Sequence, residues 1–271
     1  MEKRTKDLLI IMPAYNEEES IGDFLTQLEV PEIADIADIL VVNDGSTDDT
    51  SRIVQARGHV QINHVFNMGY TAALLSGYKY AVRRRYKYVI QIDSDGQHDP
   101  CNILTIYKRL QGSEENPKGP DIVLGSRFLE GGKSFPISWL KKVTISAFRK
   151  LIRLTTGKKI TDPTTGLQGL NSRTLLYYSV YSHFDDKFPD TNMLMQMILL
   201  GYQVEEIPAV MHPREAGISM HSGLIKQAAY MAHMFFSICA VLLRILVLKA
   251  EARHVPGKRA GRMYYESQHR D

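Results

Sequence analysis

Short apolar runs alternate, along the first part of the chain, with stretches that carry apolar residues at helical spacing. Residues 8–13 (LLIIMP) and 39–44 (ILVVND) are almost uninterrupted apolar runs, and between them Ile21, Leu25 and Leu28 share one helix face. Apolar strands separated by helices are typical of a mostly parallel sheet that helices cover on both faces. The pattern therefore predicts an α/β fold.

The same alternation continues toward the C-terminus and predicts further elements of both kinds. They are strands at residues 60–66, 86–93, 121–128 and 202–211, and helices at residues 46–56, 67–82, 137–154, 188–201 and 223–248. Another helix is expected after Pro100. Ser46 or Thr47 is the expected cap of the helix at 46–56.

Composition narrows the possible classes of protein. A chain of 271 residues with 44% hydrophobic and 23% charged residues suits one large α/β domain, or a domain plus an appendage. The net charge of +3 is too small to indicate a nucleic-acid partner. Cys101 and Cys239 are far apart in sequence, and residues 1–20 lack the pattern of a secretory signal, so we expect a reducing, cytoplasmic compartment.

Polar clusters stand directly after three of the predicted strands. The clusters are PAYNE at residues 13–17, NDGS at residues 43–46 and DSDGQHD at residues 93–99. In open α/β sheets, ligands bind outside the carboxyl ends of the strands. We therefore expect the three clusters to converge on one rim of the sheet.

The DSDGQHD cluster is the strongest candidate for a metal site. The chain has neither a P-loop motif nor a glycine-rich dinucleotide motif, so holding a diphosphate at an Asp-rich rim calls for a divalent cation. Asp93 and Asp95 are two residues apart and point the same way if the backbone is extended, and Gln97 or His98 can add a contact. The alternative is a solvated acidic turn that caps the next helix.

The other two clusters also have two interpretations. Asp44 can accept a hydrogen bond from a nucleobase, or Asn43-Asp44-Gly45 can be an ordinary turn. Tyr15 can stack on a base and Glu17 can hold a nucleoside, or both can belong to a helix start whose acidic residues complement the helix dipole.

Taken together and in this order, the clusters resemble the motifs of glycosyltransferase family 2, whose enzymes have the GT-A fold. The branch that they resemble contains the dolichyl- and polyprenyl-phosphate sugar transferases and related cell-surface polysaccharide enzymes. The resemblance implies a nucleotide-sugar donor and Mg²⁺ or Mn²⁺. It also implies roles for named positions: Pro13, Ala14, Tyr15, Glu17, Val42 and Asp44 line the nucleoside, Asp93 and Ser94 contact the nucleotide, Asp95 and Gln97 hold the metal, and Arg127 approaches the donor.

Two later stretches extend the resemblance. TDPTTGLQGLNS is similar to the family segment around the acceptor and sugar pocket, which implies a catalytic position for Asp162. HPREAGISMHS is similar to a family loop in which an Arg and a Lys six residues later grip the diphosphate; Arg214 fits, but Met220 stands at the Lys position. His212 and His221 are interpreted as solvated loop residues, and the alternative for Arg214 is a surface salt bridge.

The implied reaction is sugar transfer with inversion at the anomeric carbon. A phosphate acceptor, with a second pKa of about 6, is already ionised at neutral pH, whereas a sugar hydroxyl needs a base. Asp190 stands where relatives that act on hydroxyls carry an acidic residue. We expect it to be the base or to orient the acceptor, and its alternative role is a helix N-cap.

The C-terminal part of the chain predicts attachment to a membrane surface. We expect a catalytic domain at residues 1–222, a membrane-associating helix at 223–248 and a mobile basic tail at 249–271. Residues 228–248 would reach about 31 Å as a helix, barely a bilayer core. Lys226, His233, Ser237 and Arg244 form one polar stripe, which favours a helix lying in the interface at the inner face of the cell membrane.

Basic residues on the helix predicted at 137–154 support the same location. Lys142, Arg149 and Arg153 share a face that can contact anionic headgroups. The alternative is that the apolar C-terminal helix completes the core or a dimer interface.

Two other functions compete with a glycosyltransferase. A sugar-phosphate nucleotidyltransferase would begin with a glycine-rich basic loop, which PAYNEEES is not. A catalytically inactive nucleotide-sugar-binding or assembly partner is consistent with Met220. The donor sugar, the nucleobase, the choice between Mg²⁺ and Mn²⁺ and the oligomeric state stay open.

Overall fold

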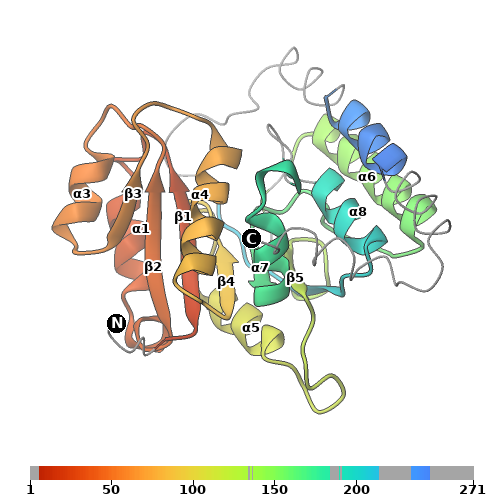
Figure 1. Ribbon diagram of the computed structural model, residues 1–271, viewed down its shortest axis with the longest axis horizontal. Helices are drawn as coiled ribbons and strands as arrows, with labels where there is room; N and C mark the ends of the chain where they lie inside the picture. Colours follow the sequence, from red (N-terminus) through yellow and green to blue (C-terminus); the bar gives the residue numbers. More distant parts are fainter. Residues whose placement is uncertain are drawn as a thin grey trace, which may run out of the picture.

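A seven-stranded sheet flanked by helices forms the body of the protein in the computed structural model (Figure 1). The structure describes residues 6–133, 135, 137–183, 189, 191–213 and 233–244. The strands are β1 (Leu8–Ala14), β2 (Ala37–Asn43), β3 (Val60–Asn63), β4 (Tyr88–Gln91), β5 (Ile122–Ser126), β6 (Gln168–Asn171) and β7 (Val204–Pro208).

Helices follow most of the strands, as the alternating pattern predicts. They are α1 (Ile21–Leu28), α2 (Pro31–Ala34), α3 (Thr50–Ala56), α4 (Tyr70–Arg83), α5 (Cys101–Leu110), α6 (Trp139–Thr156), α7 (Ser172–Tyr178), a 3₁₀ turn η1 (Tyr181–His183) and α8 (Thr191–Leu199). Residues 233–244 are also helical. Figure 1 shows this last segment beside α6, with α8 next to them and the first three strands at the other end of the molecule.

The strand order is β3-β2-β1-β4-β6-β5-β7. All the neighbouring pairs are parallel except those of β6, which runs antiparallel to both β4 and β5. The prediction of a mostly parallel sheet covered by helices is therefore confirmed. The antiparallel β6 was not predicted, because its four residues contain Gly169 and do not show a strand pattern.

Alternate side chains of the strands feed two cores, one on each face of the sheet. Leu9 and Ile11 of β1 join the core beneath α4, whereas Leu8, Ile10 and Met12 join the core beneath α1 and α5. This alternation is the two-residue period of a strand, and burial of both faces explains the uninterrupted apolar sequence.

A third, smaller core joins the helices α6 and α8 to residues 233–244. Its buried members are Phe148, Met195, Met234, Ile238 and Val241. The described part of the predicted C-terminal helix therefore packs one face on the domain. No helix in the described part of the chain is both long enough and apolar enough to cross a bilayer. The tail at 249–271 and residues 223–232 lie outside the described residues.

Candidate active site at the strand ends

The loops that follow β1, β2 and β4 contact one another at the carboxyl ends of these strands. The Ser94 hydroxyl donates to the Pro13 carbonyl at 2.8 Å, and the Ser20 hydroxyl donates to the Ser94 carbonyl at 3.3 Å. The loops after β1 and β2 also share hydrogen bonds, including one from the Asn16 N–H to Ser46 Oγ at 3.0 Å. The three polar clusters thus lie on one rim of the sheet.

The PAYNE and NDGS loops are joined by side chains that bind backbone groups of the opposite loop. The Thr47 N–H donates to Asn16 Oδ1 at 2.9 Å, and the Glu17 N–H donates to Thr50 Oγ1 at 2.9 Å. We expected Ser46 or Thr47 to cap α3, but the N-cap residue is Asp49. Ser46 and Thr47 instead bind the neighbouring loop.

The residues expected to line a nucleoside differ in how far their side chains are exposed. The Tyr15 ring is 46% exposed, which leaves a face for stacking. Pro13, Ala14 and Val42 are buried strand residues, and the Val42 side chain belongs to the core beneath α4. Side-chain contact between Val42 and a nucleoside is therefore not available, and only its backbone can contribute.

Asp44 binds the loop that follows β3. One carboxylate oxygen accepts from the Met68 N–H at 2.9 Å and contacts His64 Nδ1 at 2.7 Å, and the other accepts from the Gly69 N–H at 2.7 Å. A carboxylate has about four acceptor positions, so about one remains for a ligand. His64 Nε2 in turn contacts Ser76 Oγ at 2.9 Å.

The DSDGQHD cluster forms a bend instead of the extended backbone that we expected. The chain bends at residues 94–96, where Gly96 has a φ of 72°, so Asp93 and Asp95 are not held parallel by strand geometry. The Tyr70 hydroxyl donates to Asp93 at 3.0 Å, and Asp95 Oδ1 accepts from the Gln97 N–H at 3.1 Å.

The oxygen atoms of this bend suit a hard divalent cation. Asp93, Asp95 and Gln97 are all partly exposed, and Mg²⁺ is often held by one or two carboxylates with the remaining ligands taken from phosphates and water. Among the described residues, no group of three His, Cys, Asp or Glu side chains is placed to hold a metal. The two carboxylates and the Gln97 side-chain oxygen are donors of the kind that Mg²⁺ and Mn²⁺ prefer.

His98 is part of the bend but is not available as a ligand. Its side chain is only 1% exposed, and its Nε2 faces Asp93 Oδ2 at 3.4 Å. A buried ring in this position can only support the carboxylate beside it.

Residues 209–212 are attached to the same bend. The His212 N–H donates to the Gln97 carbonyl at 2.7 Å, and the side-chain amide of buried Asn102 both donates to and accepts from the backbone of Val210, at 2.8 and 2.9 Å. Arg214, which was expected to grip the diphosphate, lies outside the described residues.

His212 is exposed, as the sequence suggested, and its side chain also contacts a carboxylate. Its Nε2 lies 3.0 Å from Asp99 Oδ2. Burial tends to raise the pKa of Asp99, but hydrogen bonds from Cys101 and His212 outweigh it and hold that pKa below its ordinary value. His221 and Met220 lie outside the described residues.

Arg127 and Asp162 form a buried, two-pronged ion pair. Arg127 Nε and NH2 lie 2.6 and 2.7 Å from the two Asp162 oxygens, and the two side chains are 5% and 0% exposed. The Glu206 carboxylate accepts from the N–H groups of Thr161 and Asp162 and so fixes the loop before β6. With both oxygens on Arg127 and no exposure, Asp162 has the geometry of a positioning residue, although the sequence suggested a catalytic one.

Several contributors to the rim gave no sequence signal. Tyr70 and Asn102 lie in α4 and α5 and read as ordinary helix residues, His64 directly follows β3 and reads as part of that strand, and Glu206 reads as a surface position of β7. Each acts through a partner at least 12 residues away in sequence. Only the three-dimensional arrangement shows these pairings.

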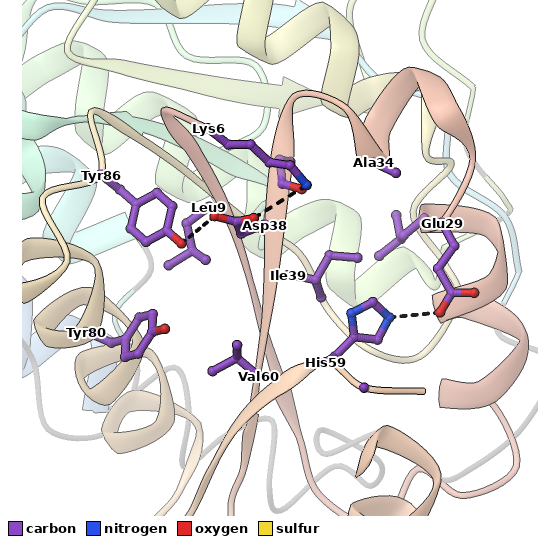
Figure 2. A pocket seen from close by; sticks show the side chains of 13 residues that line it. Lys6, Leu9, Glu29, Ala34, Asp38, Ile39, His59, Val60, Tyr80 and Tyr86 are labelled. Carbon is purple, nitrogen blue, oxygen red and sulfur yellow. Dashed lines mark hydrogen bonds and ion pairs between the residues drawn. The ribbon is translucent and has the colours of Figure 1, made fainter. Parts of the chain in front are cut away.

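A separate cavity lies at the opposite ends of the strands. It has a volume of about 480 Å³ and is lined by residues at the amino ends of β1, β2 and β3 (Figure 2). Its polar groups bind one another: the Tyr86 hydroxyl donates to Asp38 at 2.6 Å, and His59 lies 2.8 Å from Glu29. The polar clusters of the rim have no counterpart in this cavity, so the rim is the candidate active site.

The fold and the rim define an α/β protein with an acidic bend at the carboxyl ends of its strands. Residues 9–176, more than half of the chain, match the family described as Glycosyl transferase family 2. The chain belongs to this family and is a glycosyltransferase, as the motifs predicted.

Relatives in this family cover most of the chain. A polyprenol monophosphomannose synthase of Mycolicibacterium smegmatis is 29% identical over 230 residues, 81% of this chain and 82% of that protein. An undecaprenyl-phosphate mannosyltransferase of Micrococcus luteus is 29% identical over 225 residues, 80% of this chain and 88% of that protein. The predicted resemblance to the polyprenyl-phosphate branch is thereby confirmed. The chain spans 65% of an uncharacterized protein of Methanocaldococcus jannaschii, to which it is 30% identical over 165 residues.

A solved structure with the same fold is glucosyl-3-phosphoglycerate synthase from Mycobacterium tuberculosis in complex with Mn²⁺, uridine diphosphate and phosphoglyceric acid. It has a TM-score of 0.60 and 17% identity, and the match covers 88% of this chain and 78% of that chain. The predicted GT-A fold is therefore confirmed.

Substitution of Asn102 by Ala tests the attachment of residues 209–212. Loss of the two hydrogen bonds leaves the Val210 N–H without this partner, while the Val210 carbonyl still accepts from the Asp99 N–H, so we expect the free energy of unfolding to fall by about 1–3 kcal/mol. We also expect the affinity for uridine or guanosine diphosphate with Mn²⁺ to fall about tenfold, which is about 1.4 kcal/mol.

Urea denaturation and calorimetry measure the two quantities. Thr105→Ala, an exposed position of the same helix, is the control and should change neither. Unchanged nucleotide affinity in Asn102→Ala would show that the attachment does not serve the site.

Proposed function

We propose that this protein transfers a sugar from a nucleotide-diphospho-sugar to a polyprenyl phosphate, with a divalent cation, Mg²⁺ or Mn²⁺, at the Asp93–Gln97 bend. The observation that carries the proposal is the hydrogen bond from the His212 N–H to the Gln97 carbonyl, because it holds the segment after β7 at the acidic bend. The names of the two mannosyl-transferring relatives support the acceptor, and the manganese and uridine diphosphate of the structural neighbour support the cation and the donor.

The residues of the rim have separate tasks in this proposal. Asp95 and Gln97 hold the cation, Asp93 and Ser94 contact the nucleotide, Tyr15 stacks on the base, and the open acceptor position of Asp44 receives a base N–H. A bound cation neutralises negative charge on the departing diphosphate. Arg214 contributes a second positive charge there, and Arg127, oriented by Asp162, faces the donor side of the loop before β6.

Substitution of Asp95 by Asn tests the metal site. For the wild type, we expect uridine or guanosine diphosphate to bind at least tenfold more tightly with Mn²⁺ than with chelator, because the cation bridges carboxylate and phosphate. In Asp95→Asn this difference should disappear, while weak metal-free binding stays.

Calorimetry with each nucleotide, with Mn²⁺ or with chelator, gives the affinities. Asp35→Asn removes a carboxylate remote from the rim and should keep the full dependence on Mn²⁺. Equal wild-type affinity in chelator and in Mn²⁺ would contradict the metal assignment.

The nature of the acceptor decides the task of Asp190. This residue lies outside the described residues and directly precedes α8 in sequence, which is compatible with a base, with acceptor orientation and with a helix cap. A polyprenyl phosphate is already ionised at neutral pH, since its second pKa is about 6. We therefore expect Asp190→Asn to keep transfer to a polyprenyl phosphate within about tenfold of wild type.

Radiolabelled transfer from a panel of nucleotide sugars to short-chain polyprenyl phosphate and to free glycans measures this. A loss in Asp190→Asn of more than about a hundredfold, confined to a glycan acceptor, would give Asp190 the base role and the protein a hydroxyl acceptor. Thr191→Ser at the neighbouring position is the control for effects on folding of the helix start.

An apolar stripe on the outer side of α6 supports attachment to the inner, cytoplasmic face of the cell membrane. Trp139, Val143 and Leu154 are 74%, 55% and 74% exposed, and their spacing places them on one face. The opposite face of α6 carries Ile145, Phe148 and Ile152, which are buried. Trp at the edge of an apolar stripe is typical of helices in a membrane interface.

The charge around this stripe suits an anionic bilayer. Lys142, Lys150 and Arg153 are exposed on α6, and the chain from Gly131 to Thr161 has no Asp or Glu. Arg149, which was grouped with these residues, is turned inward to donate to the Thr161 carbonyl.

Residues 233–244 add to the same surface. Phe235, Phe236 and Leu243 are exposed, although Met234 and Ile238 pack on α6 and α8. Ser237 of the predicted polar stripe accepts from Asn192 of α8 at 2.6 Å. In this proposal the segment at 233–244 packs on the domain with one side and faces the bilayer with another.

The double substitution Trp139→Ser and Val143→Ser tests the membrane surface. Each side chain contributes about 1.5–3 kcal/mol when it is fully buried, so vesicle affinity should fall by at least tenfold. Sedimentation with phosphatidylglycerol vesicles measures the affinity, phosphatidylcholine vesicles and high salt should weaken wild-type binding, and Leu176→Ser on α7 is the control. Wild-type protein that stays in solution with anionic vesicles would contradict the proposal.

A further inference from the structure

Arg149 joins helix α6 to the two segments that carry the buried ion pair. Its Nε donates to the Thr161 carbonyl at 2.6 Å, and its guanidinium lies 4.5 Å from the centre of the Phe128 ring. Thr161 directly precedes Asp162, and Phe128 directly follows Arg127. Arg149 therefore contacts one sequence neighbour of each member of the pair.

Two guanidinium groups lie near the Phe128 ring. Arg127 lies 5.3 Å from the ring centre and Arg149 lies 4.5 Å from it, both within the range of cation–π attraction. Attraction of this kind restricts the direction in which Arg127 leaves the backbone. Asp162 thus orients the Arg127 guanidinium through hydrogen bonds, and the Phe128 ring orients it through cation–π attraction.

Arg149 carries an energetic cost of burial that an apolar side chain at this position would avoid. Its NH2 nitrogen is buried and has no hydrogen-bond partner in the described part of the chain. An apolar side chain such as Met would fill the space between α6 and the loop without leaving a buried donor unpaired. A planar guanidinium can stack on a ring and donate from Nε at the same time, which Lys cannot do.

We propose that Arg149 is a positioning residue for sugar transfer: it fixes the loop at Thr161–Asp162 and the Phe128 ring against α6, and thereby holds the Arg127–Asp162 pair at the rim. The inference rests on the proposed function, because it assigns the pair to the reaction. It also gives the membrane-facing helix a direct contact with the active site, since α6 carries the apolar stripe on one side and Arg149 on another.

Two substitutions of Arg149 separate geometry from charge. Arg149→Lys keeps the charge, and Arg149→Met keeps much of the volume. Because neither keeps the stacked, donating guanidinium, we expect both to lower kcat for transfer to a short-chain polyprenyl phosphate by tenfold or more. KM for the nucleotide sugar should change by less than about threefold, because the residues of the acidic bend and of the nucleoside loops are unchanged.

Phe128→Leu and its combination with Arg149→Met complete the test. If both residues act on the ion pair through one contact, the double variant should lose no more kcat than the worse single variant. Thermal unfolding checks that each variant is folded, and Lys158→Gln, an exposed position just beyond α6, should keep wild-type kcat. If Arg149→Met does not fold, Arg149→Lys and Phe128→Leu still decide the question.

Each result bears on a different statement. Wild-type kcat in Arg149→Lys would overturn the positioning role, because charge alone would then suffice, and so would multiplied losses in the double variant. Absence of transfer by the wild-type protein itself, over the whole donor panel, would instead refute the proposed function and leave the contacts of Arg149 as a structural feature.

Discussion

The rim depends on one kind of interaction. In it, a carboxylate accepts hydrogen bonds from backbone N–H groups of another loop. Asp44 holds the loop after β3 through Met68 and Gly69, and Glu206 holds the loop before β6 through Thr161 and Asp162. Loops at strand ends have N–H groups that no sheet partner takes up, and these acceptors satisfy them. Asp44 and Glu206 thus hold loops of the rim that precede and follow the acidic bend in the sequence, and the bend lies among these fixed loops.

This arrangement explains why acidic motifs alone do not tell ligand-binding residues from structural ones. Asp44 and Asp93 both follow buried strands and look alike in sequence, yet Asp44 is buried and bonded to three groups of one loop, whereas Asp93 is partly exposed beside Tyr70 and His98. Their different surroundings come from segments that lie elsewhere in the chain. Burial of a charge also requires such partners, since an unpaired buried carboxylate is costly.

Local patterns were sufficient for most of the elements and for the place of the site, but not for α2, β6 and α7 or for the pairings within the site. The strands β1 and β2, the parallel sheet and the convergence of the polar clusters follow from apolar runs and strand ends. The Arg127–Asp162 pair joins residues 35 positions apart, and no local pattern encodes it. The bend at residues 94–96 departed from expectation because the chain leaves the extended conformation soon after β4 ends, before Asp95.

The reversed direction of β6 has a consequence for how such proteins diversify. Because β6 is antiparallel to β4 and β5, the loop that contains Asp162 lies at the rim before β6 begins. The acidic bend, in contrast, lies at the rim after β4 ends. The two halves of the rim thus belong to different connections of the chain. An insertion or exchange in one of these connections leaves the other connection intact. Ligand recognition by one half of the rim can therefore evolve while the other half is inherited unchanged.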